Sequence, residues 1–90
     1  MDLDALRLFS DVARRGSFAA VARERDIDAS VVSRGVAALE SELGVRLLQR
    51  TTRSMILTEA GEIYLSRISG LIDELDQARV ERALHRIIEH

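Results

Sequence analysis

Hydroxyl and arginine side chains recur at helical spacing between residues 30 and 41, and they offer the most specific chemistry in this sequence. Residues three, four and seven positions apart share one face of a helix. Serine can donate or accept a hydrogen bond, and arginine can bind both acceptors of a guanine edge, so such a face suits the major groove of DNA. The alternative is the solvated face of an ordinary helix. The face comprises Ser30, Ser33, Arg34, Ala37 and Ser41.

A second basic feature follows this face. Residues 45–50 and 55–57 are short and strand-like, and residues 51–54 between them are polar and turn-like. The pattern predicts a small β-hairpin, or wing, whose tip carries Arg50 and Arg53. Arginines at such a tip could reach the DNA backbone or the minor groove. The alternative is that both arginines lie on a solvated turn.

The charge of the chain is unevenly distributed. Its net charge of −2 argues weakly against nucleic-acid binding. Residues 30–57, however, hold four arginines against two acidic residues, whereas the segments on either side are net negative. A local basic surface matters more for phosphate binding than the average charge does. All 13 basic residues are arginine, which suits phosphate and guanine, but we favour a high-GC genome as the cause of that bias.

Other chemistries find little support. The chain has no cysteine, and His85 and His90 offer at most one pair of metal ligands, so we expect no metal site and no cofactor. The sequence has neither a Gly-x-Ser-x-Gly motif nor a glycine-rich phosphate loop, which makes an enzyme the least favoured class. Tyr64 fits packing or dimer contact better than catalysis. We interpret the remaining acidic candidates as helix-surface or cap residues: Glu40, Glu42, Glu59 and Glu62.

Apolar periodicity predicts three helices that position these groups. They cover residues 3–15, 18–25 and 29–43. Their ends carry suitable caps, namely Gly16, Ser17, Asp28 and Gly44. The third helix has an inward stripe of Val32, Val36, Leu39 and Leu43. We expect Ile27, in the turn before this helix, to fill part of the core. Two short helices, a tight turn and a following hairpin predict a winged helix-turn-helix.

Residues 59–88 are expected to form one long helix that begins after the cap Thr58. About thirty residues make a helix roughly 45 Å long, which a domain this small cannot cover. Its apolar residues are expected to form one stripe that includes Ala60, Ala78, Leu84 and Ile87. An uncovered apolar stripe needs a partner, and a second copy is the simplest one. The predicted dimer residues are Tyr64, Ile68, Leu71 and Leu75.

Length and composition are those of one small folded domain, with 90 residues and 47% hydrophobic content. No apolar run is long enough to span a membrane. Asp2 and Asp4 give the N-terminus the wrong charge for a signal peptide. We therefore expect a soluble, cytoplasmic protein that makes no membrane contact.

Several motifs together resemble the N-terminal domain of LysR-type transcriptional regulators. The resemblance covers about residues 2–65. The motifs are Ser17-Phe18-Ala19-Ala20-Val21-Ala22, Val32-Ser33-Arg34, Leu39-Glu40-x-x-Leu43-Gly44-Val45-Arg46-Leu47-Leu48, Arg50-Thr51-x-Arg53 and Leu57-Thr58-Glu59-Ala60-Gly61. Each motif alone would be weak, but the combination is specific.

The resemblance implies a mainly α-helical fold: a winged helix-turn-helix over residues 1–58 and a linker and dimerisation helix over residues 59–90. It implies a nucleoid-associated bacterial activator or repressor that binds double-stranded DNA as a homodimer. A small-molecule effector would bind only in a C-terminal domain that is missing here, so we expect a fragment or a naturally short protein. The DNA-binding residues are then Ser17, Ala29, Ser30, Ser33, Arg34, Arg50 and Arg53, with Arg53 in the minor groove.

The sequence departs from the family pattern at four positions on the third helix. Ala29 stands where glutamine is common, Gly35 where a longer polar residue is usual, and Ala37 and Ala38 where basic residues often occur. Fewer phosphate contacts predict weaker non-specific binding and a shallower salt dependence. Gly35, Ala37 and Ala38 also mildly favour a second class of function, a protein-interaction module that pairs with a full-length regulator through the long helix.

Overall fold

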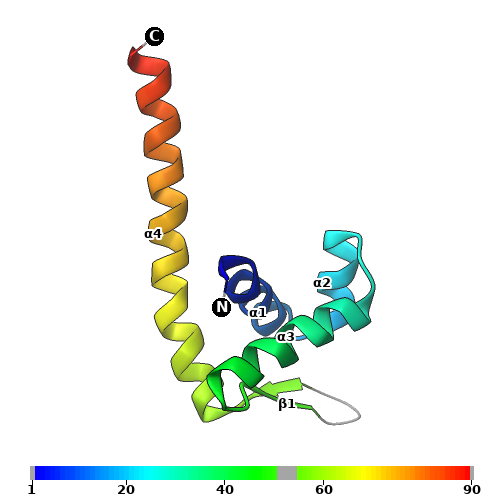
Figure 1. Ribbon diagram of the computed structural model, residues 1–90. Helices are drawn as coiled ribbons and strands as arrows, with labels where there is room; N and C mark the ends of the chain where they lie inside the picture. Colours follow the sequence, from blue (N-terminus) through cyan, green and yellow to red (C-terminus); the bar gives the residue numbers. More distant parts are fainter. Residues whose placement is uncertain (1, 51–54, 90) are drawn as a thin grey trace.

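The elements of the fold follow the order that the sequence predicts. The computed structural model describes residues 2–50 and 55–89. Its elements are α1 (Leu3–Arg15), α2 (Phe18–Arg25), α3 (Ala29–Leu43), β1 (Leu48–Arg50), β2 (Met55–Leu57) and α4 (Glu59–Glu89). In Figure 1, α1 lies beside the first half of α4, α2 lies on the far side of α1, the hairpin lies below α3, and the second half of α4 runs away from the rest. The predicted winged helix-turn-helix with a long C-terminal helix is confirmed.

Local capping chemistry sets most helix ends. Gly16 and Gly44 end α1 and α3 in the left-handed conformation, with φ of 67° and 72°, where a side chain would be strained. Ser17 begins α2, and its Oγ accepts a hydrogen bond from the backbone N–H of Ala20 at 3.1 Å. Asp28 occupies the cap position of α3, but its side chain makes no capping hydrogen bond. Asp28 therefore holds the predicted cap position, but the hydrogen bond expected from its side chain is absent.

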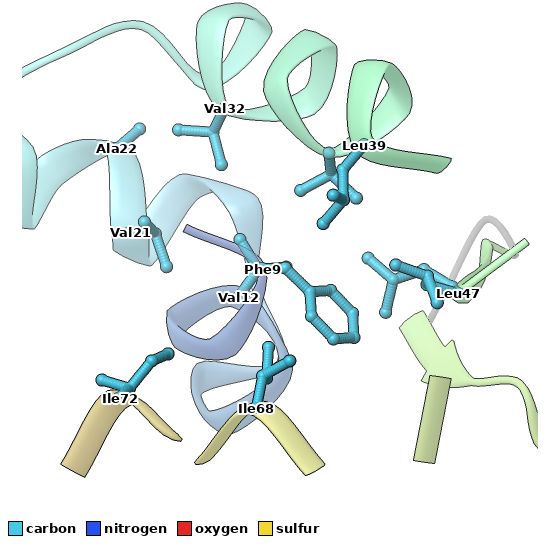
Figure 2. Packing of buried hydrophobic residues seen from close by; sticks show 11 residues of the cluster. Phe9, Val12, Val21, Ala22, Val32, Leu39, Leu47, Ile68 and Ile72 are labelled. Atoms are coloured by element: carbon cyan, nitrogen blue, oxygen red, sulfur yellow. The ribbon is translucent and has the colours of Figure 1, made fainter. Parts of the chain in front are cut away.

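One apolar core joins all four helices and the hairpin (Figure 2). It consists of Phe9, Val12, Val21, Ala22, Val32, Val36, Leu39, Leu47, Leu48, Ile68 and Ile72. Burying each large member stabilises the fold by about 1.5–3 kcal/mol. Phe9 also meets the ring of Tyr64, with centroids 6.0 Å apart. The inward stripe predicted for α3 is confirmed, since it faces this core.

The turn between α2 and α3 differs from the prediction at Ile27. Its backbone N–H donates to the carbonyl of Ala22 at 2.9 Å, which closes the end of α2. Its side chain remains 40% exposed, at the rim of a groove that Leu8 and Val31 also line. The expectation that Ile27 fills the core was therefore wrong, because the hydrogen-bonded turn holds it outside.

Glu40 connects α3 to the wing. Its Oε2 accepts hydrogen bonds from the backbone N–H groups of Leu47 and Leu48, at 2.8 and 3.2 Å. Glu40 is only 8% exposed, so its interpretation as a surface or cap residue was wrong. The carboxylate satisfies two buried donors at the start of β1, which begins at Leu48 rather than at residue 45. Antiparallel pairing with β2 then sets Leu48 opposite Leu57 and Arg50 opposite Met55.

Two glycines allow close approach between elements. A Cβ on Gly61 would lie 2.1 Å from the carbonyl oxygen of Leu47, so the first turn of α4 packs directly on the backbone that precedes β1. A Cβ on Gly35 would lie 2.5 Å from Cδ2 of Leu8, so α3 packs closely on α1. Close packing of α3 on α1 therefore explains the glycine at position 35. This departure from the family pattern no longer favours the protein-interaction alternative.

The position of α4 is set by its first half. Ile68 and Ile72 pack into the core, and Asp76 accepts two hydrogen bonds from Arg7 on α1. Beyond this point every described side chain between residues 77 and 88 is exposed. The proposed division into residues 1–58 and 59–90 stays a prediction, although the first half of α4 contributes to the common core.

The exposed apolar residues of α4 do not form the single stripe that we expected. Leu71 and Leu75 are four residues apart and share a side of the helix. Nine residues at about 100° each make two and a half turns, so Leu84 lies on the opposite side from Leu75. Leu71, Leu75 and Leu84 are all exposed. The helix therefore presents one apolar surface near the core and a second one, with Val80 and Leu84, near its C-terminal end.

Candidate nucleic-acid interface

The outer face of α3 is an exposed surface held on a rigid support. The opposite side of the helix is buried in the core, and this fixes which residues point outward. Nε of Arg34 donates to the carbonyl oxygen of Ser30 at 3.3 Å, which lays the guanidinium along the helix. Ser30, Arg34, Ala37 and Ser41 are exposed and Ser33 is half-buried. The face carries no acidic side chain, so a phosphate backbone meets no repulsion there.

Arg50 brings the wing against this face. Its Nη1 donates to Oγ of Ser33 at 2.9 Å. Its guanidinium carbon also lies 4.6 Å from the centre of the Phe18 ring, a cation–π contact at the start of α2. The structure thus joins Ser33 and Arg50, which the sequence predicted separately. Phe18 was missed, although its place directly after the cap Ser17 marks the end of α2 that faces the wing.

The other predicted DNA-binding residues occupy varied positions. Ala29 is exposed at the first turn of α3. Ser17 is half-buried and its hydroxyl caps α2. Arg53 lies outside the described residues, so its place at the tip of the wing stays a prediction.

Ion pairs hold several arginines of α1 and α2 away from this surface. Arg25 binds Asp11 and Arg15 binds Glu24, both with N···O distances of 2.7 Å. These exposed pairs contribute little to stability, about 0.2–1 kcal/mol each. Their effect is to offset the charge of one arginine on α1 and one on α2.

Comparison with known proteins identifies the family. Residues 3–62 match the bacterial regulatory helix-turn-helix proteins of the lysR family. The chain belongs to the LysR family. The matched residues include the helix-turn-helix, the wing and the first turn of α4. This LysR-family domain therefore binds DNA in transcriptional regulation.

Named relatives and solved structures agree with this assignment. The chain is 45% identical to the regulator DmlR of Escherichia coli over 94 residues, covering 96% of the chain and 31% of DmlR. It is 45% identical to the probable regulator LtrA of Klebsiella pneumoniae over 76 residues, covering 84% and 25%. The chain thus spans about a quarter to a third of these relatives.

Two solved structures share the fold closely. Full-length AphB of Vibrio cholerae has a TM-score of 0.82 at 37% identity, covering 90% of this chain and 28% of AphB. The BenM DNA-binding domain bound to catB site 1 DNA has a TM-score of 0.82 at 33% identity, covering 87% of each chain. The second match extends over nearly all of a domain that was crystallised on DNA.

The four dimer residues predicted for this LysR-family domain fall into two groups. Ile68 is 4% exposed and Tyr64 is half-buried against Phe9, so both serve the core of their own chain. Burial, with the negative charge of Glu42, raises the pKa of the Tyr64 hydroxyl. Leu71 and Leu75 are 57% and 45% exposed and remain accessible to a partner. Among residues 2–50 and 55–89, no helix combines the length and apolar content needed to cross a membrane.

Proposed function

We propose that this domain reads its DNA site by placing α3 in the major groove, with Ala29, Ser30, Ser33 and Arg34 against the base edges. The observation that carries the proposal is that one side of α3 is anchored in the core, whereas the outer face made by Ser30, Ser33, Arg34, Ala37 and Ser41 carries no acidic side chain. Small and hydroxyl side chains allow close approach, and Arg34 can bind a guanine. With Ala37 and Gly35 in place of longer polar side chains, specificity depends on few residues.

The wing and the start of α2 would hold the domain on the DNA backbone. Arg50 supplies positive charge beside α3, and Arg53 is proposed to enter the minor groove. Ser17 begins α2, where backbone N–H groups and the helix dipole favour a phosphate. Such contacts position the domain without specifying sequence. A role on DNA would also place the protein in the bacterial cytoplasm, at the nucleoid.

The exposed apolar surface of α4 that includes Leu71 and Leu75 is proposed to pair two copies. Most helical stability in proteins comes from packing, and the described side chains between residues 77 and 88 are exposed, so a partner would stabilise this part of α4. Leu71 and Leu75 lie beside the core and would form the centre of the contact. A two-fold dimer would present two copies of α3 to two half-sites. Any response to a small-molecule effector would require a further domain outside these residues.

An alternative is that α4 pairs with a different LysR-family chain and blocks it. The same exposed leucines favour this idea, because an apolar helix surface does not by itself specify an identical partner. Mixing the protein with a tagged LysR-family regulator and measuring mixed dimers by native mass spectrometry separates the two ideas. Strong DNA binding by the protein alone supports the homodimer, whereas mixed dimers with weak DNA binding support the alternative.

The test of DNA reading is selection of bound sequences from a random pool, followed by footprinting on the selected site. Arg34→Ala is expected to abolish the sequence preference and leave the fold intact. Arg53→Ala is expected to weaken binding chiefly at A·T-rich flanks. Arg86→Ala removes the same charge in the last turn of α4 and serves as the control. An unchanged footprint with Arg34→Ala would overturn the proposal.

A further inference from the structure

The guanidinium of Arg50 is held from two sides, although Arg50 lies at an exposed end of β1. The guanidinium carbon lies over the ring of Phe18, 4.6 Å from its centre. Nη1 donates to Oγ of Ser33 at 2.9 Å. A stacked, planar arginine keeps its orientation better than a flexible lysine would. Arg50 is therefore oriented toward Ser33 before any DNA arrives.

This contact changes what Ser33 can offer to a base. A serine hydroxyl has one donor hydrogen and two acceptor lone pairs. Arg50 occupies one lone pair with a cationic donor, and that bond polarises the hydroxyl and strengthens its own donation. The neighbouring positive charge also disfavours the approach of another N–H donor. Ser33 is thus prepared to donate a hydrogen bond rather than to accept one.

We propose that Arg50 is a positioning residue that sets Ser33 as a hydrogen-bond donor and so contributes to base selection. The inference rests on the proposed entry of α3 into the major groove. There, guanine presents the N7 and O6 acceptors and thymine presents O4, whereas cytosine presents an amino donor. Adenine also presents an N7 acceptor, so a donating Ser33 accepts guanine, thymine or adenine at the base it faces and discriminates against cytosine. Phe18 takes part indirectly, because it holds the guanidinium in place.

Arg50→Lys is the sharpest test, because it keeps the positive charge but loses the planar group that stacks on Phe18 and reaches Ser33. Base preferences are measured by selection from a random pool and by binding to sites that vary at one base pair. We expect the preference against cytosine at one position to fall about three- to tenfold, the range of one hydrogen bond. The salt dependence of binding should stay unchanged. Arg50→Met should relax the same position and, in addition, lower the salt slope by about 0.9 if Arg50 also contacts a phosphate.

The link to Ser33 is tested by a double-mutant cycle. Ser33→Ala alone should weaken the base preference at the same position of the DNA site. Adding Arg50→Lys to Ser33→Ala should change that preference no further. Phe18→Leu keeps an apolar side chain but removes the stacking surface, and it should relax the same position to a smaller degree. Thermal unfolding of each variant checks that the fold is retained. If Arg50→Lys does not fold, Phe18→Leu and the Ser33→Ala comparison decide the question.

The possible failures are distinct. If Arg50→Lys weakens binding equally on all sequences, or leaves the base preferences unchanged, Arg50 does not position Ser33 and the inference is overturned. If Ser33→Ala alters no base preference while Arg34→Ala does, α3 reads DNA without Ser33, and the inference again fails. If neither Ser33→Ala nor Arg34→Ala alters the preferences, the proposed reading by α3 fails as well.

Discussion

Arg7 on α1 and Asp76 on α4 form a two-pronged ion pair, with Nη2···Oδ1 at 2.6 Å and Nη1···Oδ2 at 3.3 Å. The pair joins residues far apart in the sequence at the point where α4 leaves the core. Hydrogen bonding to Arg7 lowers the pKa of the Asp76 carboxyl, and the same bond raises the pKa of Arg7. This contact thus helps to set the direction in which α4 projects from the core.

The first prediction follows from the lowered pKa of Asp76. A carboxyl whose folded pKa is depressed adds stability that is fully present above its unfolded pKa, about 3.9, and is lost as the pH falls through the folded value. Asp76→Asn should therefore be less stable than the parent at pH 7, and the difference should shrink below about pH 4. Urea unfolding at pH 7 and below about pH 4 measures this difference in stability between Asp76→Asn and the parent. Asp73→Asn, on the same helix, is the control, and an equal pH effect in both variants would contradict the role of Asp76.

The second prediction concerns Glu40. Glu40→Ala leaves the backbone N–H groups of Leu47 and Leu48 without their acceptor, at a cost of about 1–3 kcal/mol for each buried group. Glu40→Gln keeps one acceptor oxygen and should lose less. Urea unfolding gives the free energies, with the exposed Glu74→Ala as control. A Glu40→Ala variant as stable as Glu74→Ala would show that water replaces the carboxylate.

The third prediction compares three glycines changed to alanine. Gly70 has open space around it, so Gly70→Ala should stabilise α4 by up to about 1 kcal/mol through helix propensity. Gly35→Ala gains the same propensity but must displace the flexible end of Leu8, so the two effects should nearly cancel. Gly61→Ala meets a backbone carbonyl that cannot move alone, and should cost about 1–3 kcal/mol or more. Thermal unfolding gives the order, and a stable Gly61→Ala would contradict the close approach of α4.

The fourth prediction concerns the dimer. Leu71→Asp or Leu75→Asp should give monomers, because pairing would bury an unpaired charge between two helices. DNA binding should weaken in parallel, since each monomer offers one α3. Sedimentation velocity measures the assembly, and Ser66→Asp, an exposed change on another side of α4, is the control. A dimer that persists with both leucines replaced would place the contact elsewhere, for example on the surface around Val80 and Leu84.

Local rules predicted most of the secondary structure. Gly16, Gly44, Ser17 and Thr58 mark helix ends through conformations and hydrogen bonds that involve only their near neighbours. The inward stripe of α3 follows from helix periodicity alone. Because these signals span a few residues, they can be interpreted without knowing the rest of the fold.

Glu40 shows where local rules reach their limit. It follows Val36 by four residues and Leu39 by one, so its spacing already placed it at the edge of the buried stripe. The spacing could not show that two backbone N–H groups from the start of the wing would meet it there. The charge of Glu40 favoured a position on the surface. Glu40 is buried instead because the segment that leads into β1 packs back against α3.

The sequence by itself determined the helices, the wing, the family and the outward-facing Ser33 and Arg34, because periodicity and caps act over short stretches of chain. The tertiary structure decided that Ile68 serves the core while Leu71 faces solvent, that Gly61 must be glycine, and that Arg50 contacts Ser33. Each of these depends on how distant elements approach one another. Such distances arise only when the core has packed, and no pattern within one element contains them.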